Sequence, residues 1–193
     1  MDRGRRCGGH TEEVVDPQLV LEAIGIAQGH VLLDAGSGEG RFAIPAALMV
    51  GNEGKVYAAD TSEERIEALQ QAAQSEGLAQ IEAFVADATE RLPVPSGAVD
   101  VCLMANVFHE LVENGVVRGE LGEIKRALRP EGVLAVLEFR TDVERPPGPP
   151  LSRRVDPVEL NRLVAECGFR QRSSDQVGSY HYLSIFNLEE SAA

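Results

Sequence analysis

The sequence predicts an α/β fold in which a mostly parallel sheet is covered by helices. Short apolar runs suited to buried strands alternate along the chain with segments of helical periodicity. One run, residues 99–105, is almost continuously apolar, as expected for a central parallel strand that is buried on both faces. A glycine-rich turn at residues 34–40 joins the first strand to a helix, which indicates a ligand site at the edge of this sheet.

The first half of the chain shows clear helix and strand signals. Asp16 and Pro17 form an N-cap and a first helical proline, which predict a helix over residues 18–23. Thr61 and Glu64 have the spacing of a capping box at the start of the third helix. The elements expected after the first helix are a strand ending at Asp34, a helix at 41–50, a strand at 55–59, a helix at 63–76 and a strand at 81–85.

The second half is expected to complete the sheet. Its elements are the central strand, one helix over 113–128, a turn at 129–132, a strand at 133–139, a helix from 156 to 167, and strands at 169–174 and 178–186. The proline-rich connection at 140–150 is unusually long, which is typical of a lid or a binding loop. Alternation in the last strand places Tyr180 and Tyr182 on one face and His181 on the other, where we expect packing rather than a pocket role.

Length and composition fit one folded domain. The chain has 193 residues, of which 44% are hydrophobic and 25% are charged. We expect a flexible N-terminal segment over residues 1–15 and a single domain over residues 16–190. No run approaches the roughly 18 apolar residues of a transmembrane helix, and no apolar signal core is present, so we expect a cytoplasmic protein without membrane contact.

Charge and cysteine content exclude several partner classes. The 31 acidic residues outnumber the 18 basic ones, and the formal charge of −13 repels nucleic-acid phosphates. We therefore expect no nucleic-acid partner. The three cysteines lack the spacing of a metal site, so neither bound zinc nor a disulfide framework is expected.

Asp34 and three alternating glycines, Gly36, Gly38 and Gly40, select among ligands for the glycine turn. The common ligand of such a turn is a dinucleotide, whose pyrophosphate binds in a G-x-G-x-x-G loop. Here the third glycine comes one residue early. A carboxylate about 4 Å from a phosphate charge would also cost roughly 4 kcal/mol at an effective dielectric near 20. The turn therefore favours a ligand with a positively charged end.

In the segment Asp34-Ala35-Gly36-Ser37-Gly38-Glu39-Gly40, the sequence resembles the class I S-adenosylmethionine-dependent methyltransferases, whose first motif is an acid followed by alternating glycines. The resemblance covers about residues 16–188. It implies a three-layer α/β/α sandwich around a seven-stranded, mostly parallel sheet with an antiparallel final strand. It also implies S-adenosyl-L-methionine as the cofactor and methyl transfer to a small-molecule acceptor as the activity.

The resemblance assigns further residues to the cofactor. Asp60, at the tip of the second strand, is placed to accept both ribose hydroxyls, with capping of the next helix as the alternative. Thr61 follows it beside the adenine. Asp87 would accept the adenine amino group, while the backbone N–H of Ala88 donates to a ring nitrogen. Asn106, after the central strand, would face the methionine end of the cofactor.

His109 is the candidate catalytic residue. Its ordinary pKa near 6.5 suits a general base, and a hydrogen bond within the first helical turn is an equally good interpretation. Phe108 is either a wall for the sulfonium or a core aromatic. Arg153 and Arg154 have the guanidinium fork that suits a carboxylate or phosphate, although surface ion pairing is favoured for each.

Two other functions stay open from the sequence. An NAD-dependent oxidoreductase shares the glycine turn and the ribose-binding acid, but the glycine spacing, Asp34 and Asp87 argue against it. A non-catalytic S-adenosylmethionine-binding regulatory protein would keep the pocket without turnover. The identity of the acceptor is not determined, and a homodimer is left open.

Overall fold

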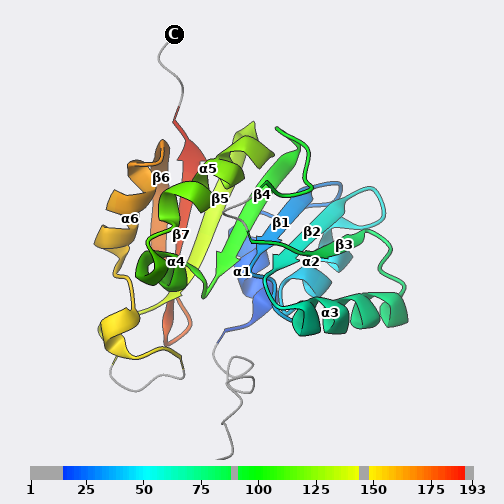
Figure 1. Ribbon diagram of the computed structural model, residues 1–193, viewed down its shortest axis with the longest axis horizontal. Coiled ribbons are helices and arrows are strands. Elements are labelled where there is room, and N and C mark those ends of the chain that lie inside the picture. The colour runs from blue at the N-terminus through cyan, green and yellow to red at the C-terminus, as the bar shows by residue number, and fades with distance from the viewer. Residues whose placement is uncertain (1–14, 88–90, 144–147, 190–193) are drawn as a thin grey trace, which may run out of the picture.

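The computed structural model describes residues 15–87, 91–143 and 148–189, within which seven strands form one sheet in the order β3-β2-β1-β4-β5-β7-β6. Strands β1 to β5 are parallel to one another, whereas β7 is antiparallel to its two neighbours, β5 and β6 (Figure 1). The strands are β1 (Val31–Ala35), β2 (Lys55–Asp60), β3 (Ile81–Val85), β4 (Val99–Ala105), β5 (Leu128–Phe139), β6 (Phe169–Val177) and β7 (His181–Leu188). The predicted mostly parallel sheet with an antiparallel final strand is confirmed.

Helices cover both faces of this sheet. They are α1 (Pro17–Ala23), α2 (Ala43–Val50) and α3 (Glu63–Glu76) on one side, and α4 (Phe108–Asn114), α5 (Val117–Ala127) and α6 (Pro157–Ala165) on the other. Figure 1 shows α4 and α5 in front of the sheet and α1 and α2 behind it. Successive residues of β1 belong to different cores, because Leu32 packs with the first group of helices and Leu33 with the second. The predicted three-layer sandwich is confirmed.

Two helix starts follow the capping signals in the sequence. Asp16 accepts a 2.9 Å hydrogen bond from the amide of Gln18 at the start of α1. Asp156 accepts bonds of 2.8 and 2.9 Å from the amides of Val158 and Glu159 at the start of α6. Each helix begins with a proline, whose missing N–H would have had no helical partner.

One helix start and one helix cap differ from the sequence-based expectation. The helix after the glycine turn begins at Ala43 rather than at Arg41. The capping box predicted at Thr61 is wrong, because the N-cap of α3 is Ser62, whose hydroxyl accepts a 3.4 Å bond from the amide of Arg65. Asp60 accepts a 2.9 Å hydrogen bond from the amide of Ser62, so the N-cap of α3 lies one residue later than expected, although the helix itself has the predicted bounds.

The single helix predicted over residues 113–128 is wrong, because the structure has two helices there. Gly115 adopts a left-handed conformation with φ of 70° and ends α4, and α5 begins at Val117. The expected turn at 129–132 also lies within the bounds of β5, where pairing shifts from Val99 with Leu128 to Val101 with Val133. The split leaves α4 as a short separate helix immediately beyond the end of β4.

The carboxyl ends of β1, β2, β4 and β5 lie at one edge of the sheet, and the first residue of β7, His181, pairs with the last residue of β5, Phe139. In such sheets ligands bind beyond the carboxyl ends of the strands. At the opposite edge, Asp100 accepts a 2.6 Å bond from the amide of Val31 and pairs with Arg129, so it joins strands there. No helix in the described ranges is both long and apolar enough to cross a bilayer.

Candidate active site

The turn between β1 and α2 combines close packing with open space. Gly36, Gly38 and Gly40 have positive φ angles of 81°, 55° and 94°. A side chain on Gly36 would overlap Val107, and one on Gly40 would overlap Leu69. A Cβ built on Gly38 would meet no atom of the described residues within 4 Å, apart from those of its two chain neighbours. Two glycines thus let the turn pack against its neighbours, while Gly38 leaves room for a ligand against bare backbone.

Asp34, at the end of β1, is buried with one oxygen unsatisfied. Its side chain is 1% exposed, and its Oδ2 has no hydrogen-bond partner within the described residues. Burial raises the pKa of Asp34 to about 7; the amide of Ala43 lowers it in part, and the charge of Asp60 raises it further. A buried carboxylate oxygen without a partner is costly unless a ligand supplies one. A cationic group would meet this need best.

Asp60 ties the glycine turn to β2. Its Oδ2 accepts a 2.9 Å bond from the amide of Gly38, and its Oδ1 accepts a 2.9 Å bond from the amide of Ser62. The side chain is 7% exposed, and the guanidinium of Arg65 lies 3.8 Å from it. Each carboxylate oxygen has a second lone pair, so these bonds leave acceptor capacity for ribose hydroxyls. Thr61, the next residue, is exposed.

Asn106 follows β4 with an unusual backbone and an unsatisfied side chain. Within the described part of the chain, Asn106 is the one non-glycine residue with a positive φ angle, which is 59°. Its amide donates a 2.8 Å bond to the carbonyl of Leu137, which fixes its place beside β5. Its side-chain Oδ1 is buried without a hydrogen-bond partner in the described residues. Strain together with an unsatisfied oxygen is typical of a ligand site.

The predicted adenine side is described in part. Asp87 follows β3 and is exposed, while Ala88 lies outside the described residues. The carbonyl of Asp60 accepts a 3.1 Å bond from the amide of Ala86, which holds this segment against β2. Glu120 of α5, which the sequence did not single out, lies near Asp87: burial first and the charge of Asp87 second raise its pKa to about 7.

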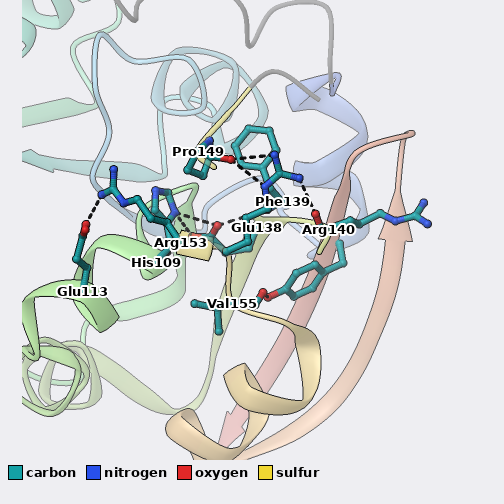
Figure 2. Close-up of polar contacts among 10 residues, drawn as sticks. His109, Glu113, Glu138, Phe139, Arg140, Pro149, Arg153 and Val155 are labelled. Carbon is teal, nitrogen blue, oxygen red and sulfur yellow. Dashed lines mark hydrogen bonds and ion pairs between the residues drawn. The ribbon is translucent and has the colours of Figure 1, made fainter. Parts of the chain in front are cut away.

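His109, near the start of α4, is paired with a buried acid that the sequence did not reveal. Its Nδ1 lies 3.1 Å from both carboxylate oxygens of Glu138, and its backbone amide donates to Oε1 of the same residue at 3.1 Å (Figure 2). His109 is 6% exposed and Glu138 is fully buried. Instead of the hydrogen bond within the first helical turn that was the alternative to a role as base, the ring of His109 contacts Glu138 of β5.

The environment of His109 favours its charged form. Burial lowers its pKa, but the hydrogen bond and the charge of Glu138 outweigh burial, so the pKa of His109 is raised above its ordinary value. The charge of Glu110 adds to this rise, and the charge of Arg153 opposes it. Among the described residues, no group forms a hydrogen bond with the second ring nitrogen, Nε2. His109 therefore has one nitrogen held by an acid and one available to a ligand.

The two arginines before α6 behave differently. Arg153, in the short 3₁₀ turn Leu151–Arg153, pairs with Glu113 of α4, as expected for a surface ion pair (Figure 2). The same expectation for Arg154 is wrong. Its buried guanidinium donates to backbone carbonyls instead, and so fastens the proline-rich connection to the end of β5. The acceptors are the carbonyls of Pro149 at 2.9 and 3.0 Å, Arg140 at 2.8 Å and Val143 at 3.2 Å.

His181 and Phe108 lie in packed surroundings. The ring of His181 is fully buried, its centroid lies 4.2 Å from that of Phe139, and neither ring nitrogen has a hydrogen-bond partner in the described residues. Burial, followed by the charges of Arg41 and Arg154, lowers the pKa of His181 to about 4. Phe108 is fully buried in the core beneath α4 to α6, which favours the core aromatic over a wall for the sulfonium.

The fold and the residues at its carboxyl edge match a known family. A family model described as "Methyltransferase domain" matches residues 32–132, which is more than half of the chain. A solved S-adenosylmethionine-dependent methyltransferase from Aquifex aeolicus is 31% identical, with a TM-score of 0.83 and 91% of each chain covered. The chain belongs to the S-adenosylmethionine-dependent methyltransferases. The cofactor of this methyltransferase is thus S-adenosyl-L-methionine, as predicted, and not a nicotinamide dinucleotide.

Curated relatives of the methyltransferase include two ubiquinone/menaquinone biosynthesis C-methyltransferases. The protein from Cellvibrio japonicus is 27% identical over 167 residues, which are 86% of this chain and 63% of the relative. The protein from Ectopseudomonas mendocina is 30% identical over 171 residues, which are 86% of this chain and 61% of the relative. The methyltransferase therefore spans less than two thirds of the length of these relatives.

The residues at the edge of the sheet fit S-adenosylmethionine. The ligand carries an ammonium and a sulfonium, and the buried oxygens Oδ2 of Asp34 and Oδ1 of Asn106 lack protein partners within the described chain. The described residues leave the space around a Cβ on Gly38 open, and Asp60 keeps acceptor capacity beside it. The chemistry of this donor and acceptor set thus agrees with the family.

Proposed function

We propose that this methyltransferase methylates a small molecule whose nucleophile must first lose a proton, such as a phenol or a hydroquinone. The observation that carries the proposal is His109, whose Nδ1 is held by Glu138 and whose Nε2 has no hydrogen-bond partner within the described residues. The curated relatives are C-methyltransferases of ubiquinone/menaquinone biosynthesis by name, which supports the same class of acceptor. The formal charge of −13 supports a small molecule over a nucleic acid.

The cofactor would be held by residues that the sequence predicted. Asp34 and Asn106 would bind its methionine end, Asp60 its ribose, and Asp87 its adenine, with Gly38 beneath it. When bound, S-adenosylmethionine supplies a methyl group on a positively charged sulfur, which makes that methyl group electrophilic. The protein must then align the acceptor with the methyl group and exclude water.

His109 would prepare the acceptor. Its Nε2 would take the proton from an acceptor hydroxyl, and the electron pair of the broken O–H bond would stay on the acceptor. In a phenolate or hydroquinone anion, this negative charge is shared between the oxygen and ring carbons, so either can attack a methyl group. The resulting imidazolium would be stabilised by the carboxylate of Glu138, which is already in place.

Two measurements test the proposal in sequence. Calorimetric titrations with S-adenosylmethionine, S-adenosylhomocysteine and NADH should show binding of the first two alone. Asp60→Asn should weaken that binding by roughly tenfold or more, because it removes charged hydrogen bonds to the ligand. Methyl-labelled S-adenosylmethionine is then incubated with a reduced benzoquinone, a reduced naphthoquinone and their O-methylated forms.

The outcomes of these measurements separate the parts of the proposal. Label transfer to a free hydroquinone, without transfer to its di-O-methylated form, supports an acceptor that must lose a proton. Cofactor binding with no transfer to any of these acceptors would contradict the proposed acceptor class. Binding with no transfer to a broad acceptor panel would favour a regulatory protein.

A further inference from the structure

We infer that Glu138 is a positioning residue for His109, which fixes the ring so that Nδ1 carries the proton and Nε2 faces the acceptor as a base. This inference rests on the proposed function, in which His109 accepts the acceptor proton. Glu138 itself would touch neither the cofactor nor the acceptor. It would act through the orientation, the protonation and the charge of His109.

The contacts between the two residues define the orientation of the ring. Oε1 of Glu138 accepts from the backbone amide of His109 at 3.1 Å, and both carboxylate oxygens lie 3.1 Å from Nδ1. An ionised carboxylate can only accept hydrogen bonds, so Nδ1 must be the protonated nitrogen of the neutral ring. The lone pair then lies on Nε2, as a general base requires. The backbone bond also fixes the start of α4 relative to β5.

The position of Glu138 is costly for a residue with a purely structural role. It is fully buried in β5, among the apolar residues Val133, Leu134, Val136, Leu137 and Phe139. Removing a carboxylate from water is unfavourable unless the carboxylate is paired and hydrogen-bonded. The histidine, the amide of Phe139 at 3.4 Å and the charge of the buried Arg154 compensate it. Because the partner of the acid is a titratable ring at the ligand edge, the pair suits proton transfer.

The charged groups around His109 come from each element packed against it. Glu138 is on β5, Glu110 is on α4 itself, and Arg153 is on the 3₁₀ turn beside α4. Figure 2 shows Arg153 next to His109, with its guanidinium directed toward Glu113. The two acids stabilise the imidazolium and the arginine opposes them, so loss of the Glu138 charge should change the pKa of His109 most.

The test uses Glu138→Gln and a matched control, Glu113→Gln, in the full chain with S-adenosylhomocysteine bound. Each variant removes one carboxylate, that of Glu138 beside α4 or that of Glu113 on α4, but Glu113 pairs with Arg153 whereas Glu138 contacts His109. Nitrogen-15 NMR of the histidine rings reports the tautomer and the pKa of His109. We expect the proton on Nδ1 in the native protein, and a pKa that falls clearly in Glu138→Gln and stays close to native in Glu113→Gln.

Turnover with a hydroquinone acceptor gives the second readout. Glu138→Gln should lower kcat at least tenfold with little change in the KM for S-adenosylmethionine, and should shift the pH profile of kcat in the direction of the His109 pKa. If Glu138→Gln does not fold, Glu138→Asp is used in its place: it keeps the charge but withdraws the carboxylate from Nδ1 by one methylene, so it tests the contact that positions the ring. A shifted kcat profile in a variant with native cofactor affinity is not expected from a structural role.

Failure of the inference and failure of the proposed function give different results. A native His109 with its proton on Nε2, or a Glu138 variant with an unchanged His109 pKa, would overturn the positioning role. Full turnover by His109→Gln would overturn the base, and with it the proposed function, whatever the NMR result for Glu138 shows.

Discussion

Two buried histidines at the same edge of the sheet have opposite environments. His109 is 6% exposed and is held by the carboxylate of Glu138, whereas His181 is fully buried and neither of its ring nitrogens has a hydrogen-bond partner within the described residues. The pKa of His109 is raised, because Glu138 outweighs the effect of burial. The pKa of His181 is lowered to about 4, by burial and then by Arg41 and Arg154.

The difference arises from two adjacent residues of β5. Glu138 contacts His109, and Phe139 contacts His181, because successive side chains of a strand point to opposite faces. A histidine at the ligand edge is therefore only a candidate base. The residue that faces it decides whether it can hold a proton near neutral pH, and here that residue differs between the two faces of the sheet.

The largest expected effect separates the two histidines in turnover. His109→Gln should lower kcat by roughly 10²- to 10⁴-fold, because it removes general base catalysis. His181→Gln should change kcat far less, because a ring with a pKa of about 4 has little driving force to take a proton from the acceptor. Steady-state kinetics with a hydroquinone acceptor measures both. Equal losses in the two variants would contradict the distinction.

The next effect concerns Asp34, a third buried titratable group at this edge. The pKa of Asp34 is about 7 in the free protein, so much of its carboxyl group is protonated below that pH. A cationic ligand binds the ionised carboxylate, so binding at lower pH releases the proton of Asp34. Affinity for S-adenosylmethionine should therefore rise as the pH increases from 6 to 8. Asp34→Asn should weaken binding by roughly 10- to 100-fold and remove this dependence, because the charged partner is lost.

Calorimetry at several pH values, in two buffers of different ionisation enthalpy, measures the affinity and the proton release together. Asp16→Asn is a matched control, since Asp16 caps α1 at the surface. An Asp34 variant with the native pH dependence would show that another group is responsible.

A smaller effect is expected on the stability of the fold. The unfolded chain binds a proton at His181 with a pKa near 6.5, whereas the folded chain does so at about 4, so this residue destabilises the protein as the pH falls below 6.5. The penalty amounts to about 2 kcal/mol at pH 5. His181→Leu should remove it, so the variant should gain stability at pH 5 relative to pH 8.

Urea unfolding of the native protein and of His181→Leu at both pH values measures this difference. The pH 8 experiment is the control for packing changes, because His181 is then neutral in both states. A stability difference that is the same at pH 5 and pH 8 would mean that His181 titrates normally in the folded protein.

The smallest effect concerns Arg153. Its charge lowers the pKa of His109, so Arg153→Gln should raise that pKa slightly further. The shift should be small because the guanidinium is partly exposed and already paired with Glu113. Proton NMR titration of His109 measures it, and 0.5 M salt should reduce the difference between the variant and the native protein. A fall of the pKa would contradict the described placement of Arg153.

Local patterns were enough to predict much of the fold. The strands at 81–85 and 99–105 and the helix at 63–76 have the predicted bounds, because apolar periodicity and Gly77 mark them locally. The helix predicted over 113–128 failed because its periodicity continues across Gly115, whose left-handed conformation divides it. A glycine inside a helical pattern was the available signal.

The site was harder to predict because its parts are distant in the sequence. The glycine turn could be interpreted from adjacent residues, but His109 and Glu138 are 29 residues apart and meet only through the pairing of β4 with β5. The available signal was an isolated acid near the end of an otherwise apolar strand. Arg154 could not be predicted either, since its partners are backbone carbonyls of an irregular connection.

The most direct test is an NMR titration of the native protein with S-adenosylhomocysteine bound. The four histidines of the chain can be assigned with the variants His109→Gln and His181→Gln. We expect His109 to titrate above 6.5 with its proton on Nδ1 when neutral, and His181 to stay neutral down to a pH of about 4. Titration of His109 below 6.5, or of both histidines near 6.5, would contradict the assignment of His109 and Glu138 as the proton-accepting pair.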